Sequence, residues 1–158
     1  METLDLRRLS WLGPLTVMAS VAAVLTVRCI AVSVLRPDPG FMPLTLTPVI
    51  FDTVLFVTLA VFVFHRMAAG GRLPPALLAL GGERVLTLDP IPAYRVIAGR
   101  ALLVSFLPDI AIGFSSRASW SYALALAALH IAAWAVCVPM LTRLTIRTPP
   151  SGIASGNV

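Results

Sequence analysis

Four long apolar runs, separated by segments rich in proline, glycine and arginine, dominate the chain. They cover about residues 11–35, 48–65, 94–114 and 120–141. The hydrocarbon core of a bilayer, about 30 Å thick, needs about 20 helical residues to cross it, within a range of roughly 17–25. Each run reaches that range. The pattern therefore predicts an all-α, polytopic membrane protein, built as a four-transmembrane-helix bundle.

The second run, VIFDTVLFVTLAVFVF, is rich in β-branched and aromatic residues, which in water favour a strand. In lipid an isolated strand would leave its backbone N–H and C=O groups unpaired, so a helix is expected. Helix-breaking residues bound the runs. RPDPG follows the first, Pro48 opens the second, Pro92 precedes the third, and Pro149 and Pro150 follow the fourth.

The chain is predicted to form one membrane domain over residues 1–147. Its longest connection, residues 67–93, contains the apolar segment PALLAL, which is too short to span a bilayer and is expected at the interface. Residues 148–158, TPPSGIASGNV, are expected to be disordered. Arg7 and Arg8 before the first run resemble the start of a signal peptide. That run continues past Arg28, so we expect a retained helix, with cleavage as the alternative.

Composition supports lipid as the solvent of this chain. Hydrophobic residues make up 58% of it and charged residues 12%, with a mean hydropathy of +0.93. Soluble domains sit near 45–50% apolar and about 25% charged. Nucleic-acid binding requires basic residues that gather on one soluble face. Here the basic residues flank the apolar runs instead. The lipid bilayer is therefore the predicted partner, and nucleic acid is excluded.

Arginine placement predicts the orientation. All of the basic residues are arginines, 12 in number. With the N-terminus inside, the cytoplasmic segments hold Arg7, Arg8, Arg66, Arg72, Arg84, Arg95, Arg143 and Arg147, against Arg36 and Arg117 in the outer links. Cytoplasmic segments of membrane proteins carry such an excess. Both termini of a multi-pass protein of the inner (cytoplasmic) membrane are therefore expected in the cytoplasm, with Trp11, Tyr94, Trp120 and Tyr122 as interfacial anchors.

Three charged residues in different runs are predicted to lie at one depth. At a rise of 1.5 Å per residue, Arg28, Asp52 and Asp109 lie roughly 10, 6 and 8 Å from the outer ends of their helices. Ionisable groups inside a span are costly and point to a functional site. The cluster is either a polar pocket that binds an ion or small ligand or relays protons, or an ion pair that fixes packing. The structural ion pair is favoured, since a buried charge demands a partner.

The segment SFLPDI adds polarity to the third helix. Pro108 lacks a backbone donor and disturbs the bond to the carbonyl four residues back. Ser105 lies one turn earlier and Asp109 directly follows. Broken helices mark binding sites in transporters, so Ser105 and Pro108 join the candidate cluster.

His130 is the remaining candidate, near the middle of the fourth run. Histidine relays protons or ligates haem or metal, but a histidine with no partner at helical spacing is more often a packing residue. Arg100 is expected to extend its side chain to the interface. The chain contains no G-x-S-x-G, H-E-x-x-H or P-loop motif. No catalytic residue, metal site or cofactor is therefore predicted.

Several segments together resemble a family of small, functionally uncharacterised bacterial four-helix membrane proteins. The shared features are Pro-Leu-Thr-x-x-Pro at residues 43–48, Arg-x-Ile-Ala at 95–98, Ser-x-x-Pro-Asp at 105–109, and His130 in the fourth helix. The 67–93 connection departs from that pattern and looks like an insertion. The resemblance implies the four-helix architecture and a bacterial origin. It implies no reaction, substrate or partner.

Three functions are compatible with these features. The favoured hypothesis is a non-enzymatic small membrane subunit of a larger complex, or a bundle that self-associates as a homo-oligomer. A small transporter or proton-linked carrier would use the Arg28, Asp52 and Asp109 cluster. A membrane haem, metal or enzyme protein would depend on His130.

Overall fold

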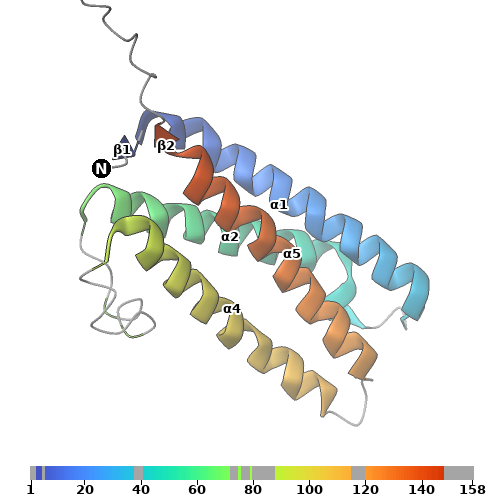
Figure 1. The fold of residues 1–158 in the computed structure, drawn as a ribbon. Coiled ribbons are helices and arrows are strands. Elements are labelled where there is room, and N and C mark those ends of the chain that lie inside the picture. Colours follow the sequence, from blue (N-terminus) through green and yellow to red (C-terminus); the bar gives the residue numbers. More distant parts are fainter. Residues whose placement is uncertain are drawn as a thin grey trace, which may run out of the picture.

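Within the part of the chain that the computed structural model describes there are four long helices, and they run side by side (Figure 1). The structure describes residues 3–4, 6–37, 41–71, 75, 79, 88–114 and 120–147. The helices are α1 (Leu6–Leu35), α2 (Leu46–Ala68), α4 (Pro90–Gly113) and α5 (Trp120–Leu144). Each is long and apolar enough to cross a membrane. The predicted all-α bundle with four membrane-spanning helices is therefore confirmed.

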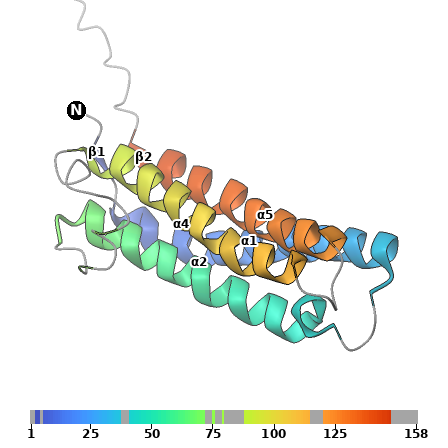
Figure 2. The ribbon, with the colours of Figure 1, turned by 90° about the horizontal axis from the view of Figure 1, so that it is seen from below.

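The helices pack with α1 and α5 at the centre of the contacts. The most extensive interface joins α1 to α5, α4 packs mainly on α5, and α2 packs mainly on α1 (Figures 1 and 2). Two short strands, β1 (Thr3–Leu4) and β2 (Ile146–Arg147), pair antiparallel beside the start of α1 and the end of α5. We call this end of the bundle the termini side. The other end, which holds the 3-10 helix η1 (Met42–Leu44), is the opposite side.

Local sequence explains where α2 ends and where α4 begins. Gly70 takes the positive φ of 68° that an L side chain disfavours. Its N–H donates to the Met67 carbonyl, and the Gly71 N–H donates to the Arg66 carbonyl at 2.8 Å. This pair of bonds is the Schellman motif, which satisfies the last carbonyls of a helix. Pro90 begins α4, where its missing N–H costs no helical bond.

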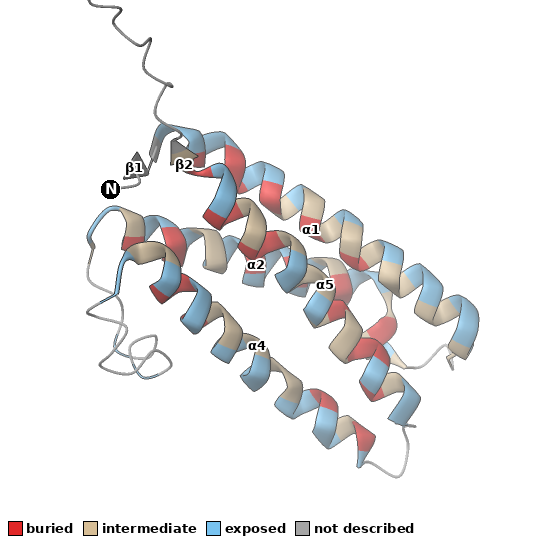
Figure 3. Ribbon diagram, viewed as in Figure 1, coloured by how far each residue is buried: buried red, intermediate tan, exposed pale blue. Residues whose placement is uncertain are grey.

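Buried positions lie mainly where the helices face one another, and exposed positions lie on the outer faces (Figure 3). Many of the exposed residues are large and apolar. One buried group consists of Leu9, Val57, Val63, Phe64, Met67, Ala93, Tyr94, Ile97, Cys137, Val138 and Leu141. A second, nearer the opposite side, consists of Val24, Leu44, Val49, Leu126 and Leu129. The outward residues of α2 include Phe51, Val54, Leu55, Phe56, Leu59 and Phe62. An apolar exterior of this kind is stable against lipid and unstable against water.

Hydroxyl groups inside the bundle bond to their own helices. Thr16, Thr53 and Thr142 are buried, and each donates to the carbonyl four residues back. Such bonds remove the penalty of a buried polar group without a partner on another helix. Ser20 is the exception among the described residues, because its buried hydroxyl has no partner.

Tyr94 is not an interfacial anchor, contrary to expectation. Its side chain is 2% exposed, and its ring meets Phe64 edge to face at a centroid distance of 4.9 Å. Its hydroxyl lies 3.8 Å from the sulfur of Cys137. Trp11 and Trp120 remain exposed near helix starts. Position along the helix suggested an anchor, but the face that Tyr94 occupies points into the core.

Two sequence predictions lie largely outside the described residues. Of residues 72–87, only 75 and 79 are described, so the expected interfacial helix in the 67–93 connection stays a prediction. The expected disorder of residues 148–158 does too.

Candidate functional site

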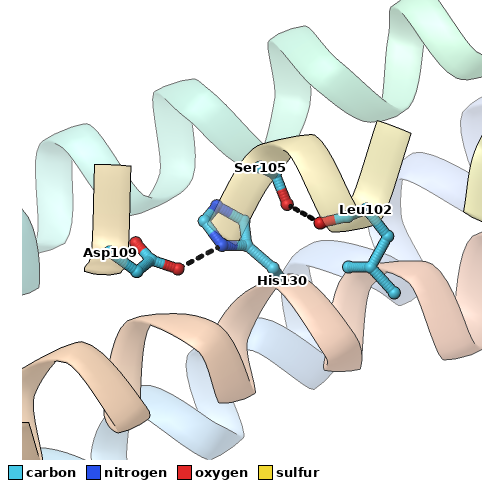
Figure 4. A network of polar contacts seen from close by, with 4 residues as sticks. All are labelled: Leu102, Ser105, Asp109 and His130. Atoms are coloured by element: carbon cyan, nitrogen blue, oxygen red, sulfur yellow. Dashed lines mark hydrogen bonds and ion pairs between the residues drawn. The ribbon is translucent and has the colours of Figure 1, made fainter. Parts of the chain in front are cut away.

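Asp109 and His130 form the polar centre between two membrane-spanning helices. Asp109 lies on α4 and His130 on α5, and Nδ1 of the imidazole is 3.0 Å from Oδ2 of the carboxylate (Figure 4). The Asp109 side chain is 7% exposed, whereas that of His130 is 38% exposed. The carboxylate is therefore enclosed by protein, and the imidazole joins it to the outside of the bundle.

Residues of α4 shape the surroundings of this pair. Pro108 stands inside α4 directly before Asp109 and, having no N–H, leaves the Val104 carbonyl without its helical donor. The Ser105 hydroxyl donates to the Leu102 carbonyl at 2.7 Å (Figure 4). The Phe106 ring lies 6.3 Å from the imidazole, centroid to centroid. Ser105, Pro108 and Asp109 therefore form one polar stretch of α4 that His130 reaches from α5.

The pair has a clear chemical capacity. Histidine and aspartate are among the side chains that most often transfer protons in proteins. Paired ionisable groups inside a span are the components of proton relays. Among the described residues, no group of three histidine, cysteine or acidic side chains lies close enough to hold a metal ion. Proton exchange is thus the chemistry for which this pair provides the groups.

Arg28 makes a different contact from the one expected. Its Nε donates to the Leu44 carbonyl at 2.8 Å. Leu44 ends η1, and Thr45 alone separates it from the start of α2, so the guanidinium ties α1 to the segment that leads into α2. Among the described residues, no ion pair or hydrogen bond joins Arg28 to Asp52 or Asp109. The hydrogen-bond acceptor of Arg28 is therefore a backbone carbonyl and not a carboxylate.

Asp52 is the member of the expected cluster that faces outward. It is exposed on α2, and the structure records no hydrogen bond or ion pair between it and any described residue. Its neighbours one turn away, Leu55 and Phe56, are exposed too. The carboxylate therefore stands in an apolar outer face.

Sequence reasoning identified Asp109 and His130 separately and missed their pairing. Asp109 lies four residues before the end of α4 at Gly113, and His130 lies ten residues after the start of α5 at Trp120. If residues were matched by their distance from the connection between α4 and α5, Asp109 would be opposite a residue closer to the start of α5 than His130. The two side chains nevertheless meet, at 3.0 Å. The signal that could have found the pair is the rule that a carboxylate inside a span requires a polar partner.

Two further ionisable residues and the two cysteines lie elsewhere on the helices. Arg100 and His65 are exposed on α4 and α2. Cys29 is exposed on α1, while Cys137 is buried on α5, and neither forms a disulfide.

Comparison with protein-family models, curated proteins and solved structures produces no match to this chain. The function must therefore be inferred from the site and from the surface of the bundle.

Proposed function

We propose that this integral membrane protein is non-enzymatic and works by association, as a small subunit of a membrane complex or as a self-associating bundle. The observation that carries the proposal is the exposed carboxylate of Asp52. At 1.5 Å per residue, it lies about 9 Å from the start of α2, within the part of the helix that crosses the bilayer. An ionisable side chain at that depth is costly against lipid and normally faces protein or water.

The residues around Asp52 fit a protein partner. Phe56 lies one helical turn away and is 62% exposed, and Leu59 lies on the same face and is also exposed. Helices associate in membranes through close packing and through polar groups that bond across the interface. A neighbouring span that contacts Phe56 would cover Asp52 and offer it a hydrogen-bond donor. The Asp52 face of α2 is the interface in this proposal.

The proposed topology places both termini in the cytoplasm. Among the described residues, the termini side of the bundle carries Arg7, Arg8, Arg66, Arg95 and Arg143 at or near helix ends, and the opposite side carries Arg36. Positive charge is retained on the cytoplasmic side during insertion. A bacterial inner membrane is the expected location.

Site-specific photocross-linking in native membranes tests the association. A photoreactive side chain at Phe56 is expected to form a protein adduct, because that position borders Asp52 on the proposed interface. Leu107 on α4 is the matched control, since its exposed fraction is also 62%. The mass of the adduct distinguishes a second copy from another protein.

A further substitution links the adduct to the carboxylate. Asp52→Leu in the Phe56 probe variant is expected to reduce the adduct severalfold, whereas Thr58→Leu, exposed on another part of α2, is expected to leave it unchanged. A protein that yields no adduct at position 56, or equal adducts at 56 and 107, would refute the proposed interface.

A second candidate function has one specific observation in its favour, the hydrogen bond between Asp109 and His130. Two proton-binding groups from neighbouring spans, joined at 3.0 Å, provide the elementary step of a proton-linked carrier. In this version the pair, and not the Arg28 cluster, is the proton-binding site.

Reconstitution into vesicles that enclose a pH-sensitive dye tests this candidate. A membrane potential is expected to drive proton movement through the wild-type protein, and Asp109→Asn and His130→Gln are each expected to abolish it. His65→Gln removes the other histidine, exposed near the end of α2, and is expected to have no effect. Equal flux in all of these variants would eliminate the carrier.

A further inference from the structure

A groove between α4 and α5 opens on the termini side of the bundle. Its volume is about 230 Å³, and its described lining consists of Arg95, Trp134, Val138, Pro139, Thr142 and Arg143. The two helices lie side by side in both views of the ribbon (Figures 1 and 2). Two arginines and no acidic side chain occur in this described lining. The groove is therefore electrically positive.

The position of Arg95 is held by a buried hydroxyl. Its terminal nitrogen donates to the Thr142 Oγ1 at 3.2 Å. Thr142 is 0% exposed and in turn donates to the Val138 carbonyl at 2.8 Å. Because the threonine is fixed within α5, it positions the arginine from α4 at the groove. One N–H group of the guanidinium is used in this bond, and the others remain available for an anion.

Arg143 supplies the second charge and has no hydrogen bond or ion pair to any described residue. It follows Thr142 directly and lies one residue before the end of α5. An arginine at that level is near the headgroup region of a bilayer. With Arg95 it forms a pair of guanidinium groups, which suit the bidentate recognition of phosphate oxygens.

The groove changes from charged to apolar along the helix axis. Trp134 lies ten residues before the end of α5, about 15 Å deeper at 1.5 Å per residue. Its side chain is 36% exposed, and Val138 and Pro139 lie between it and the arginines. A phospholipid has the same order, with a charged phosphate at the interface and apolar chains beneath it.

We propose that this α4–α5 groove binds the phosphodiester headgroup of an anionic phospholipid. Arg95 and Arg143 contact the phosphate, and Trp134 contacts the upper part of an acyl chain. A groove of about 230 Å³ is smaller than the pockets of roughly 300–1,000 Å³ that enclose drug-sized ligands. It therefore holds the headgroup while the chains remain in the bilayer. Basic grooves between spans are known to select anionic lipids on this principle.

Fluorescence quenching in vesicles tests the site. The protein is reconstituted into phosphatidylcholine vesicles with a small fraction of either brominated phosphatidylglycerol or brominated phosphatidylcholine. Bromine quenches tryptophan on contact, and the Trp134 signal is obtained by difference from Trp134→Phe. The anionic lipid is expected to quench Trp134 at a several-fold lower fraction than the zwitterionic lipid. Arg95→Gln or Arg143→Gln is expected to weaken this preference about fivefold. That factor corresponds to the attraction of about 1 kcal/mol between one arginine and an anionic membrane surface.

Three controls make the result decisive. Arg66→Gln removes a charge from the same side of the bundle on α2 and is expected to keep the preference. Thr142→Val, which removes the acceptor of Arg95 without changing charge, is expected to weaken it. Circular dichroism checks that every variant retains its helices. Equal quenching by both lipids, or an unchanged preference in folded Arg95→Gln and Arg143→Gln variants, would overturn the proposal. Displacement of the lipid by equimolar inorganic phosphate would also overturn it, because the site would then bind free phosphate.

Discussion

Asp109 and His130 show how a single polar group is accommodated inside a bundle that has few of them. The enclosed carboxyl group is hydrogen-bonded, at 3.0 Å, to the imidazole that a neighbouring span brings to it. The buried threonines instead bond to their own helices. At the residue scale, the difference depends on whether the group has a proton to donate. A threonine hydroxyl donates to the carbonyl four residues back in its own helix, whereas an ionised aspartate has no proton to donate and needs a donor from elsewhere.

A double-mutant cycle measures the energy of this pair. Asp109→Ala, His130→Ala and the double variant are expected to show a coupling free energy of about 0.5–2 kcal/mol, the range found for hydrogen bonds between membrane helices. The free energy of unfolding in mixed detergent micelles is the observable. The corresponding cycle between Asp109 and Arg28, which have no contact, is expected to give a coupling near zero. A larger coupling for the Asp109–Arg28 cycle would show that the contacts have been assigned wrongly.

At the element scale, α4 and α5 approach each other closely next to their link. A Cβ atom added to Gly113 would lie 2.8 Å from Cε3 of the Trp120 ring, closer than carbon atoms pack. Gly113→Ala is therefore expected to lower the free energy of unfolding by about 1–3 kcal/mol, the usual range for overpacking. Gly99, on the same helix, has no atom within 4 Å of an added Cβ. Gly99→Ala is expected to leave stability unchanged or raised, since alanine is the better helix former. A similar loss in both variants would contradict the packing argument.

The connection between α1 and α2 depends on Arg28. Arg28→Gln removes a charged donor from the Leu44 carbonyl, an interaction worth about 1.5–3 kcal/mol. The backbone amides of Leu44 and Thr45, which close η1, are then expected to exchange with solvent about tenfold faster or more. Hydrogen exchange followed by mass spectrometry is the measurement. Arg36→Gln, exposed after the end of α1, is the control and is expected to leave these rates unchanged.

At the scale of the whole molecule, the arrangement of the helices places the first and last described residues, Thr3 and Arg147, at one end of the bundle. The β1–β2 pair joins residues 3–4 to residues 146–147 there. With an even number of spans the two ends share a compartment, and the proposed topology puts that compartment in the cytoplasm. A fluorescent protein fused after residue 158 is expected to fluoresce, and alkaline phosphatase fused after residue 36 is expected to be active. Phosphatase activity at the C-terminal fusion, with no activity at residue 36, would reverse the topology.

The number of helices and their order could be read from the sequence, because the bilayer imposes a length on each apolar run independently of the rest of the chain. The position of Arg28, Asp52 and Asp109 along their helices could be read in the same way. Their partners could not. Depth is one coordinate, whereas a contact also depends on the rotation and stagger of two helices. In the structure, Asp109 is hydrogen-bonded to His130, and Arg28 donates to a backbone carbonyl. Asp52 faces outward.

The sequence by itself determined a four-span membrane bundle, since hydropathy and span length are properties of single segments. Tertiary structure alone decided that Tyr94 is buried, that Asp109 and His130 meet, and that Arg95 and Arg143 line one groove. Each of these depends on how side chains from different helices fit together. The physical reason is that the free energy of transfer into lipid is a sum of contributions from single residues. Packing and hydrogen-bond energies instead depend on pairs of residues from different helices.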